Sequence, residues 1–239
     1  MGRKLANLPD RVERRLAQLE EALLGALGED LVALVVHGSA ARGGYREGSS
    51  DVDLVVVLEN DDRETLEAIG PALKLARLSA RIEAIVVRKD ELACAADVFP
   101  LLWDDVKQDG VCIRGKNPFT GLQITDEHRR LRIEQELRDA RIRMRRMLVE
   151  ADDDEHLAGA LDRKVKQVAS PLRALLALRG TPSADHTPAA VLKAASKRWK
   201  VGIKAVRSLR EQPREAYDQL AALLDAAVGD CDAGLKESV

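Results

Sequence analysis

The sequence predicts an α/β (α+β) domain with a small mixed sheet, followed by an all-α helical bundle. Up to about residue 117, short apolar runs alternate with segments in which apolar residues recur every three or four positions. This is the pattern of a sheet covered by helices. After that point only the helical spacing continues. Asn117–Pro118 interrupts the pattern, so we expect an N-terminal domain at 1–117 and a C-terminal helical bundle domain at 118–239.

Four apolar runs are expected to form the strands of the sheet: residues 31–36, 52–58, 81–87 and 111–113. The first run is continuous, which is typical of a strand covered on both faces, and the second carries acids at its start. Helices are expected at 10–27 and 61–78, where the apolar residues fall on one helical face. Because proline lacks the amide hydrogen and its ring clashes with the preceding turn, Gly70–Pro71 predicts a kink in the second helix.

The C-terminal half is expected to contain several packed helices. Residues 125–149 begin with threonine, a favourable cap, and keep the helical spacing, as do residues 154–179. Ser170–Pro171 predicts a break or restart within the latter. Thr187–Pro188 predicts another helix start, because proline is favoured at the first helical position. Further helical segments lead to Val228.

The composition excludes several classes of protein. No apolar run approaches the roughly 20 residues that span a bilayer, so no membrane partner is expected. The 38 Lys and Arg residues nearly balance the 40 Asp and Glu residues, and aromatic residues make up only 3%. A nucleic-acid partner is therefore disfavoured, since such proteins use basic patches and aromatic platforms. The three cysteines lack paired spacing and no apolar export signal is present, which indicates a cytoplasmic protein.

Other polar residues are expected to have structural roles. Residues 127–150 contain eight arginines against five acids, and we expect a solvated helix face with ion pairs four residues apart. Asp104 and Asp105 are expected to be solvated helix acids. His37 is expected to pack at a strand end, and His186 to be an ordinary loop residue.

Two carboxylates at the start of the second predicted strand are candidate metal ligands. Side chains alternate along a strand, so Asp51 and Asp53 project to the same side, roughly 6.6 Å apart along the chain. Two such acids at the end of an apolar strand repel each other unless a cation neutralises them. Mg²⁺ suits this position, because it prefers oxygen ligands and is held by a few carboxylates together with substrate phosphates.

The turn after the first predicted strand is a candidate phosphate site. Gly38 permits a phosphate to approach backbone N–H groups, and Ser39 adds a hydroxyl donor. Arg42 follows three residues later and can add a charge-assisted contact to the same phosphates. These three residues are the expected triphosphate-binding group.

A third acid is expected on the strand at 81–87. Glu83 is flanked there by apolar residues, and an acid inside a short apolar strand is costly unless it is paired or binds a metal. Asp90 and Glu91, by contrast, are explained by a helix N-terminus. Glu83 is therefore the candidate that would complete the site.

Gly38–Ser39, a gap of eleven residues, and Asp51–Val52–Asp53 together resemble the polymerase-beta-like nucleotidyltransferase superfamily, which also has a third acid on a later strand. The likeness covers residues 31–87. It is greatest for the minimal and aminoglycoside-modifying members, which place a small α/β nucleotidyltransferase domain before a helical bundle.

The resemblance implies an enzyme that transfers a nucleoside monophosphate to a hydroxyl acceptor. We expect AMP from ATP as the transferred group and a small molecule as the acceptor. Two Mg²⁺ ions are implied, with Asp51, Asp53 and Glu83 as catalytic residues and metal ligands. Glu83 would be either a ligand or the general base.

Two alternatives stay open. One is a regulatory or toxin–antitoxin-like module whose helical half binds a protein partner, with or without AMP transfer to that protein. The other is a nucleotide-binding protein without turnover. A homo-oligomer is compatible with the sequence in each case.

Overall fold

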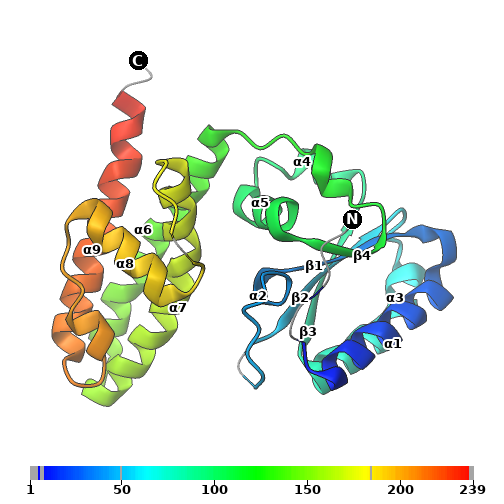
Figure 1. The fold of residues 1–239 in the computed structure, drawn as a ribbon, viewed down its shortest axis with the longest axis horizontal. Helices are drawn as coiled ribbons and strands as arrows, with labels where there is room; N and C mark the ends of the chain where they lie inside the picture. Colours follow the sequence, from blue (N-terminus) through cyan, green and yellow to red (C-terminus); the bar gives the residue numbers. More distant parts are fainter. Residues whose placement is uncertain (1–4, 6–7, 49, 184, 237–239) are drawn as a thin grey trace. The chain divides into compact units, whose positions relative to one another are not determined.

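The computed structural model describes residues 5, 8–48, 50–183 and 185–236 (Figure 1). It consists of two compact units, Met1–Ile124 and Thr125–Val239. The first contains a mixed four-stranded sheet with helices and the second is helical, so the predicted fold class is confirmed. The boundary predicted at Asn117–Pro118 falls within the first unit. No helix in the described part of the chain is both long and apolar enough to cross a membrane.

The sheet has the strand order β3-β2-β1-β4. Its strands are β1 (Leu31–His37), β2 (Val52–Leu58), β3 (Ile82–Arg88) and β4 (Val111–Gly115). β1 is antiparallel to both β2 and β4, whereas β2 and β3 are parallel. The predicted strand positions therefore agree with the structure to within one or two residues.

Helices cover both faces of the sheet, which explains the continuous apolar runs at 31–36 in β1 and 54–58 in β2 (Figure 1). On one face, α1 (Asp10–Leu27) and α3 (Arg63–Ala80) pack through Leu23 and Ile69 against Leu54 and its neighbours. The other face is covered by α5 (Pro100–Asp109) and the 3₁₀ turn η2 (Pro118–Gly121). Short elements complete the unit: η1 (Gly28–Asp30), α2 (Gly38–Ala41) and α4 (Glu91–Cys94).

The second unit contains α6 (Asp126–Glu150), α7 (Asp154–Leu178), α8 (Pro188–Trp199), η3 (Ala205–Ser208) and α9 (Pro213–Lys236). The predicted caps are confirmed, because Thr125 Oγ1 accepts a hydrogen bond from the His128 amide and Thr187 Oγ1 accepts one from the Ala190 amide. The core of the unit is aliphatic and includes Ile133, Leu161, Leu172, Leu220 and Leu224.

The two internal prolines do not end their helices. α3 continues through Pro71, and α7 continues through Pro171, so the restart predicted at Ser170–Pro171 is wrong. Val168 and Leu172 are buried on either side of Pro171. Packing of an apolar face supplies most of a helix's stability and here outweighs the loss of one backbone hydrogen bond.

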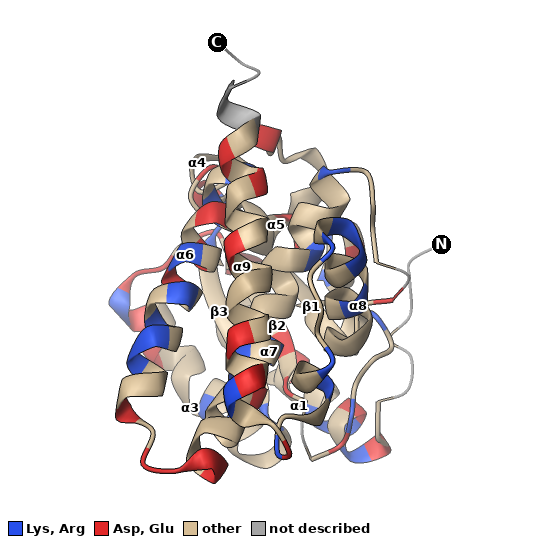
Figure 2. Ribbon diagram, turned by 90° about the vertical axis from the view of Figure 1, so that its left-hand side faces the viewer, with Lys and Arg blue, Asp and Glu red and all other residues tan. Residues whose placement is uncertain are grey.

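The arginine-rich helix α6 is stabilised by ion pairs, as predicted. Five pairs connect residues four apart on this helix: Arg130–Glu134, Arg132–Glu136, Arg138–Glu134, Arg143–Asp139 and Arg146–Glu150. Figure 2 shows basic residues of α6 beside acidic residues of α9, where Arg138 binds Asp232 and Arg141 binds Asp225, each at 2.7 Å. These arginines therefore connect the helices of the bundle.

Candidate active site

The turn between β1 and β2 begins at Gly38, directly after His37 ends β1. Gly38 has φ +67°, in the left-handed region that favours glycine. A Cβ atom at this position would overlap the Oδ2 atom of Asp53 on β2. Gly38 is thus required both by its backbone conformation and by the approach of the Asp53 carboxylate. Ser39, the next residue, is half-buried in the single turn α2.

The sheet register places three polar residues of neighbouring strands, His37, Asp53 and Glu83, side by side. Asp53 lies opposite Glu83 in the parallel β2–β3 pair and opposite His37 in the antiparallel β1–β2 pair. Register partners project to the same face of a sheet. Ile85, which follows on the same face of β3, is 40% exposed. This end of the face is therefore accessible to a ligand.

Asp53 is the central carboxylate of the group. Burial raises its pKa, and the nearby acids Asp51 and Asp105 raise it further, while His37 and Arg42 act in the opposite direction. A half-buried carboxylate surrounded by other carboxylates is costly to ionise. A cation bound beside it would remove that cost.

The two outer acids are each paired with an arginine from the end of α3. Asp51 accepts a hydrogen bond from Arg81 Nε at 2.7 Å, and Glu83 accepts one from Arg77 Nε at 3.0 Å. Within the described residues, no three His, Cys, Asp or Glu side chains are gathered closely enough to hold a metal ion. The structure thus places Asp53 and Glu83 on one face of the sheet. The carboxylates of Asp51 and Glu83, however, bind arginines.

Asp105 of α5 is a site residue that the sequence analysis missed. Its Oδ2 accepts a hydrogen bond from the Gly38 amide at 3.3 Å and lies 3.5 Å from His37 Nδ1, and its Oδ1 binds Arg42. The side chain is only 13% exposed. The prediction of a solvated Asp105 is therefore wrong, because Trp103 and Val106 turn this part of α5 onto the sheet.

Arg42 points to α5 in this structure. Besides its bond to Asp105, it lies 3.9 Å from an oxygen of Asp109. Asp105 and Asp109 are one helical turn apart, so they project from the same side of α5. That spacing, beside the buried Trp103, is the sequence signal that could have identified an arginine partner.

His37 is buried at the end of β1, as predicted, but it also borders the site. Its relative exposure is 7%, and neither ring nitrogen forms a hydrogen bond with the described residues. His186 lies in the loop before α8, in the helical unit, as expected.

The donor set fits Mg²⁺. Carboxylate oxygens are the ligands this ion prefers, and the pKa of Asp53 is raised first by its burial and then by the neighbouring acids Asp51 and Asp105. The arginine pairs of Asp51 and Glu83 are partly exposed, with 41% and 45% of the acid side chains accessible. Exposed ion pairs contribute only about 0–1 kcal/mol, so both carboxylates can exchange partners at little cost.

Comparisons with known proteins place the chain in a family. The family model described as "Nucleotidyltransferase domain" matches residues 16–138, and no curated protein matches the chain. Among solved structures, spectinomycin adenyltransferase AAD(9) from Enterococcus faecialis, with ATP and spectinomycin, is similar at 14% identity with a TM-score of 0.46. That match covers 89% of this chain and 99% of the other. Because the family match spans more than half of the chain and contains the Gly-Ser turn and the Asp-x-Asp strand, the protein belongs to the polymerase-beta-like nucleotidyltransferase family and is a transferase.

Proposed function

We propose that this protein transfers AMP from ATP to a hydroxyl group of a small-molecule acceptor in a Mg²⁺-dependent reaction. The observation that carries the proposal is the contact between the Gly38 turn and the Asp53 carboxylate. A group that can bind phosphate and a group that can bind the metal thus lie at one point of the sheet.

In this proposal the turn after β1 binds the triphosphate. The Ser39 backbone amide and the Ser39 hydroxyl donate to phosphate oxygens that approach beside Gly38, and Arg42 adds a charge-assisted contact. Asp105 is the positioning residue of this group, because its carboxylate contacts both the Gly38 amide and the Arg42 guanidinium.

The three acids have separate tasks. Asp51 and Asp53 are the proposed ligands of two Mg²⁺ ions, which when bound would stabilise the charge of the triphosphate and lower the pKa of the acceptor hydroxyl. Glu83 lies in register with Asp53, on the accessible end of the face. Its carboxylate is proposed to serve as a ligand or to accept the proton of the attacking hydroxyl.

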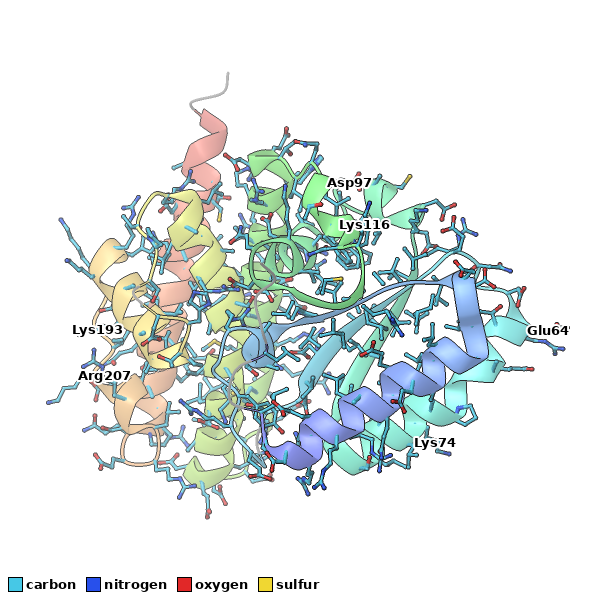
Figure 3. The ribbon with its side chains drawn as sticks, turned by 45° about the vertical axis from the view of Figure 1, so that its right-hand side comes forward. Glu64, Lys74, Asp97, Lys116, Lys193 and Arg207 are labelled. Atoms are coloured by element: carbon cyan, nitrogen blue, oxygen red, sulfur yellow. The ribbon has the colours of Figure 1, made fainter. Side chains whose placement is uncertain are left out.

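The proposal is tested by incubating the full chain with Mg²⁺, each α-labelled nucleoside triphosphate in turn, and separate pools of metabolites, RNA and cell proteins. We expect label from ATP in the metabolite pool. The double variant Asp51→Asn with Asp53→Asn should lose both this label and Mg²⁺-dependent triphosphate binding. Asp97→Asn, at an exposed acid seen in Figure 3, should lose neither.

Three results would contradict the proposal or part of it. Label found only in the protein pool would indicate a module that modifies a protein partner. Triphosphate binding without transfer to any pool would indicate a nucleotide-binding protein without turnover. Equal triphosphate binding by the double variant would move the metal site away from Asp51 and Asp53.

A further inference from the structure

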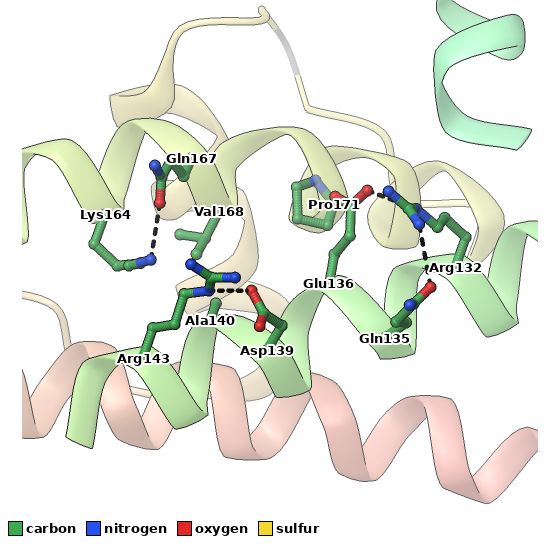
Figure 4. Close-up of a pocket in the computed structure, with 10 residues that line it drawn as sticks. All are labelled: Arg132, Gln135, Glu136, Asp139, Ala140, Arg143, Lys164, Gln167, Val168 and Pro171. Atoms are coloured by element: carbon green, nitrogen blue, oxygen red, sulfur yellow. Dashed lines mark hydrogen bonds and ion pairs between the residues drawn. The ribbon is translucent and has the colours of Figure 1, made fainter. Parts of the chain in front are cut away.

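A groove lies between α6 and α7, within the helical unit (Figure 4). Its volume is about 400 Å³, within the range of roughly 300–1,000 Å³ typical of sites for small molecules. Six of its lining residues are on α6: Arg132, Gln135, Glu136, Asp139, Ala140 and Arg143. Four are on α7: Lys164, Gln167, Val168 and Pro171. The lining is mainly charged and polar, which favours a charged ligand over an apolar one.

Two of the three cations in the groove are already paired. Arg132 Nε donates to Glu136 Oε1 at 2.9 Å, and Arg143 Nε donates to Asp139 Oδ2 at 2.7 Å. Both pairs connect residues of the same helix, as the dashed lines in Figure 4 show. The two acids of the groove, Glu136 and Asp139, are therefore paired with arginines of their own helix, α6.

Lys164 is the third cation, and it has no carboxylate partner within the described residues. Its ammonium donates to the neutral Gln167 Oε1 at 2.8 Å, and the residue is only 8% exposed. Figure 4 shows Lys164 and Arg143 projecting from the two helices into the same space. An ammonium group removed from water without a counter-ion is costly, so the groove carries an uncompensated positive charge.

The surroundings of Lys164 agree with this description. Burial lowers its pKa, and the nearby guanidinium of Arg143 lowers it further, while Asp139 opposes the shift. Within the described residues, Arg143 uses only Nε in its bond to Asp139, which leaves its terminal amino groups able to donate. Two donors from facing helices can therefore act on one bound group.

We propose that the α6–α7 groove binds a small organic anion whose carboxylate or phosphate oxygens accept hydrogen bonds from Lys164 and Arg143. Ala140, Val168 and Pro171 supply the apolar part of the wall, and the volume accommodates a molecule larger than a single inorganic ion. Lys164 lies outside the matched nucleotidyltransferase domain, which ends at residue 138. The proposal rests on contacts within the helical unit and does not depend on the proposed reaction.

The proposal is tested by calorimetric titration of the full chain with citrate and, separately, with inorganic phosphate. We expect saturable binding of at least one probe with a dissociation constant below about 10 mM. Lys164→Met keeps the length of the side chain but removes the charge, and it should weaken binding by about tenfold or more, as expected for the loss of a hydrogen bond to a charged group. Lys164→Arg should retain binding.

The matched control is Lys166→Met on the same helix, because Lys166 is exposed and paired with Asp162; its affinity should equal that of the wild type. Arg143→Gln provides a second variant if Lys164→Met does not fold, and it should also weaken binding. Citrate binding alone would assign a carboxylate ligand, and phosphate binding would assign a phosphorylated one. Failure of both probes to bind, or binding that is lost in Ser39→Ala but not in the groove variants, would overturn the proposal.

Discussion

Asp53 on β2 and Glu83 on β3 are direct register partners in the parallel part of the sheet. Because partners in register project to the same face, the two carboxylates lie at the same end of one face although thirty positions separate them in the chain. The distance between them is set by backbone pairing and does not depend on a flexible loop. Two side chains on paired strands are held more rigidly relative to each other than two side chains on loops.

Glu83→Gln should separate binding from transfer. The substitution preserves the shape of the side chain but removes its charge and basicity, so triphosphate binding should persist. The transfer rate should fall by at least the roughly 10²-fold that is typical for the loss of a general base. Rates and triphosphate affinities are measured side by side, with Glu64→Gln as the control at an exposed glutamate (Figure 3). Undiminished turnover would remove Glu83 from the catalytic group.

Gly38→Ala should abolish triphosphate binding, since the added methyl group meets the Asp53 carboxylate. The suitable control is Gly48→Ala, because Gly48 also has a positive φ, +79°, but an added Cβ there has no neighbour within 4 Å. Both variants carry the backbone cost of about 1–2 kcal/mol for a left-handed alanine. Only Gly38→Ala should also lose affinity for triphosphate in a calorimetric titration. Equal losses of affinity in both variants would show that backbone strain alone causes the effect.

Ser39→Ala should weaken triphosphate binding without affecting the fold. The loss of one hydrogen bond to a charged group costs about 1.5–3 kcal/mol, which corresponds to a decrease in affinity of about ten- to a hundredfold. Thermal unfolding should show little change, because Ser39 is only half-buried. Wild-type affinity in this variant would place the phosphate contact on other residues.

The strands and most helices were predictable because their sequence signals are local. Residues 31–36 and 54–58 are apolar without interruption, and Thr125 and Thr187 stand where their side chains cap helices. The continuity of α7 through Pro171 was not predictable in this way, since it depends on the burial of the residues around the proline. Local propensity and tertiary packing disagree there, and packing prevails.

The candidate site was predictable only in part, for the same reason. The alternation of side chains along a strand places Asp53 and Glu83, but it says nothing of the arginines that bind the outer acids. Arg81, which binds Asp51, is itself the left-handed residue that follows α3. Its position is defined only by the connection between α3 and β3. Similarly, Asp104 and Asp105 are equivalent as sequence neighbours, and only the packing of α5 turns Asp105 towards Gly38.

Asp105→Asn should destabilise the N-terminal unit. Asparagine can still accept a hydrogen bond from the Gly38 amide, but the mostly buried Arg42 guanidinium loses its closest counter-ion. Hydrogen bonds to charged groups contribute about 1.5–3 kcal/mol, and the free energy of unfolding should decrease by about that amount in a denaturant titration. Asp97→Asn should leave it unchanged. If Asp105→Asn were as stable as the wild type, Asp105 would not hold the turn.

Asp53→Asn should have the opposite effect on stability, and this effect should depend on pH. The folded-state pKa of Asp53 is raised above 3.8, first by burial and then by Asp51 and Asp105. A carboxyl group with a raised pKa favours folding while it is protonated, and this contribution is lost as the pH rises from the unfolded value through the folded pKa. At neutral pH, in the absence of ligands, the Asp53 carboxyl group therefore destabilises the protein, and Asp53→Asn should raise the unfolding temperature. The difference in unfolding temperature between the two proteins should shrink as the pH falls towards 4.

Thermal unfolding measured across this range checks the sign of the effect. A variant that is less stable than the wild type at neutral pH would show that Asp53 stabilises the fold through its charge. In that case the Asp53 carboxylate would have a structural role, and its environment would not favour binding of a cation.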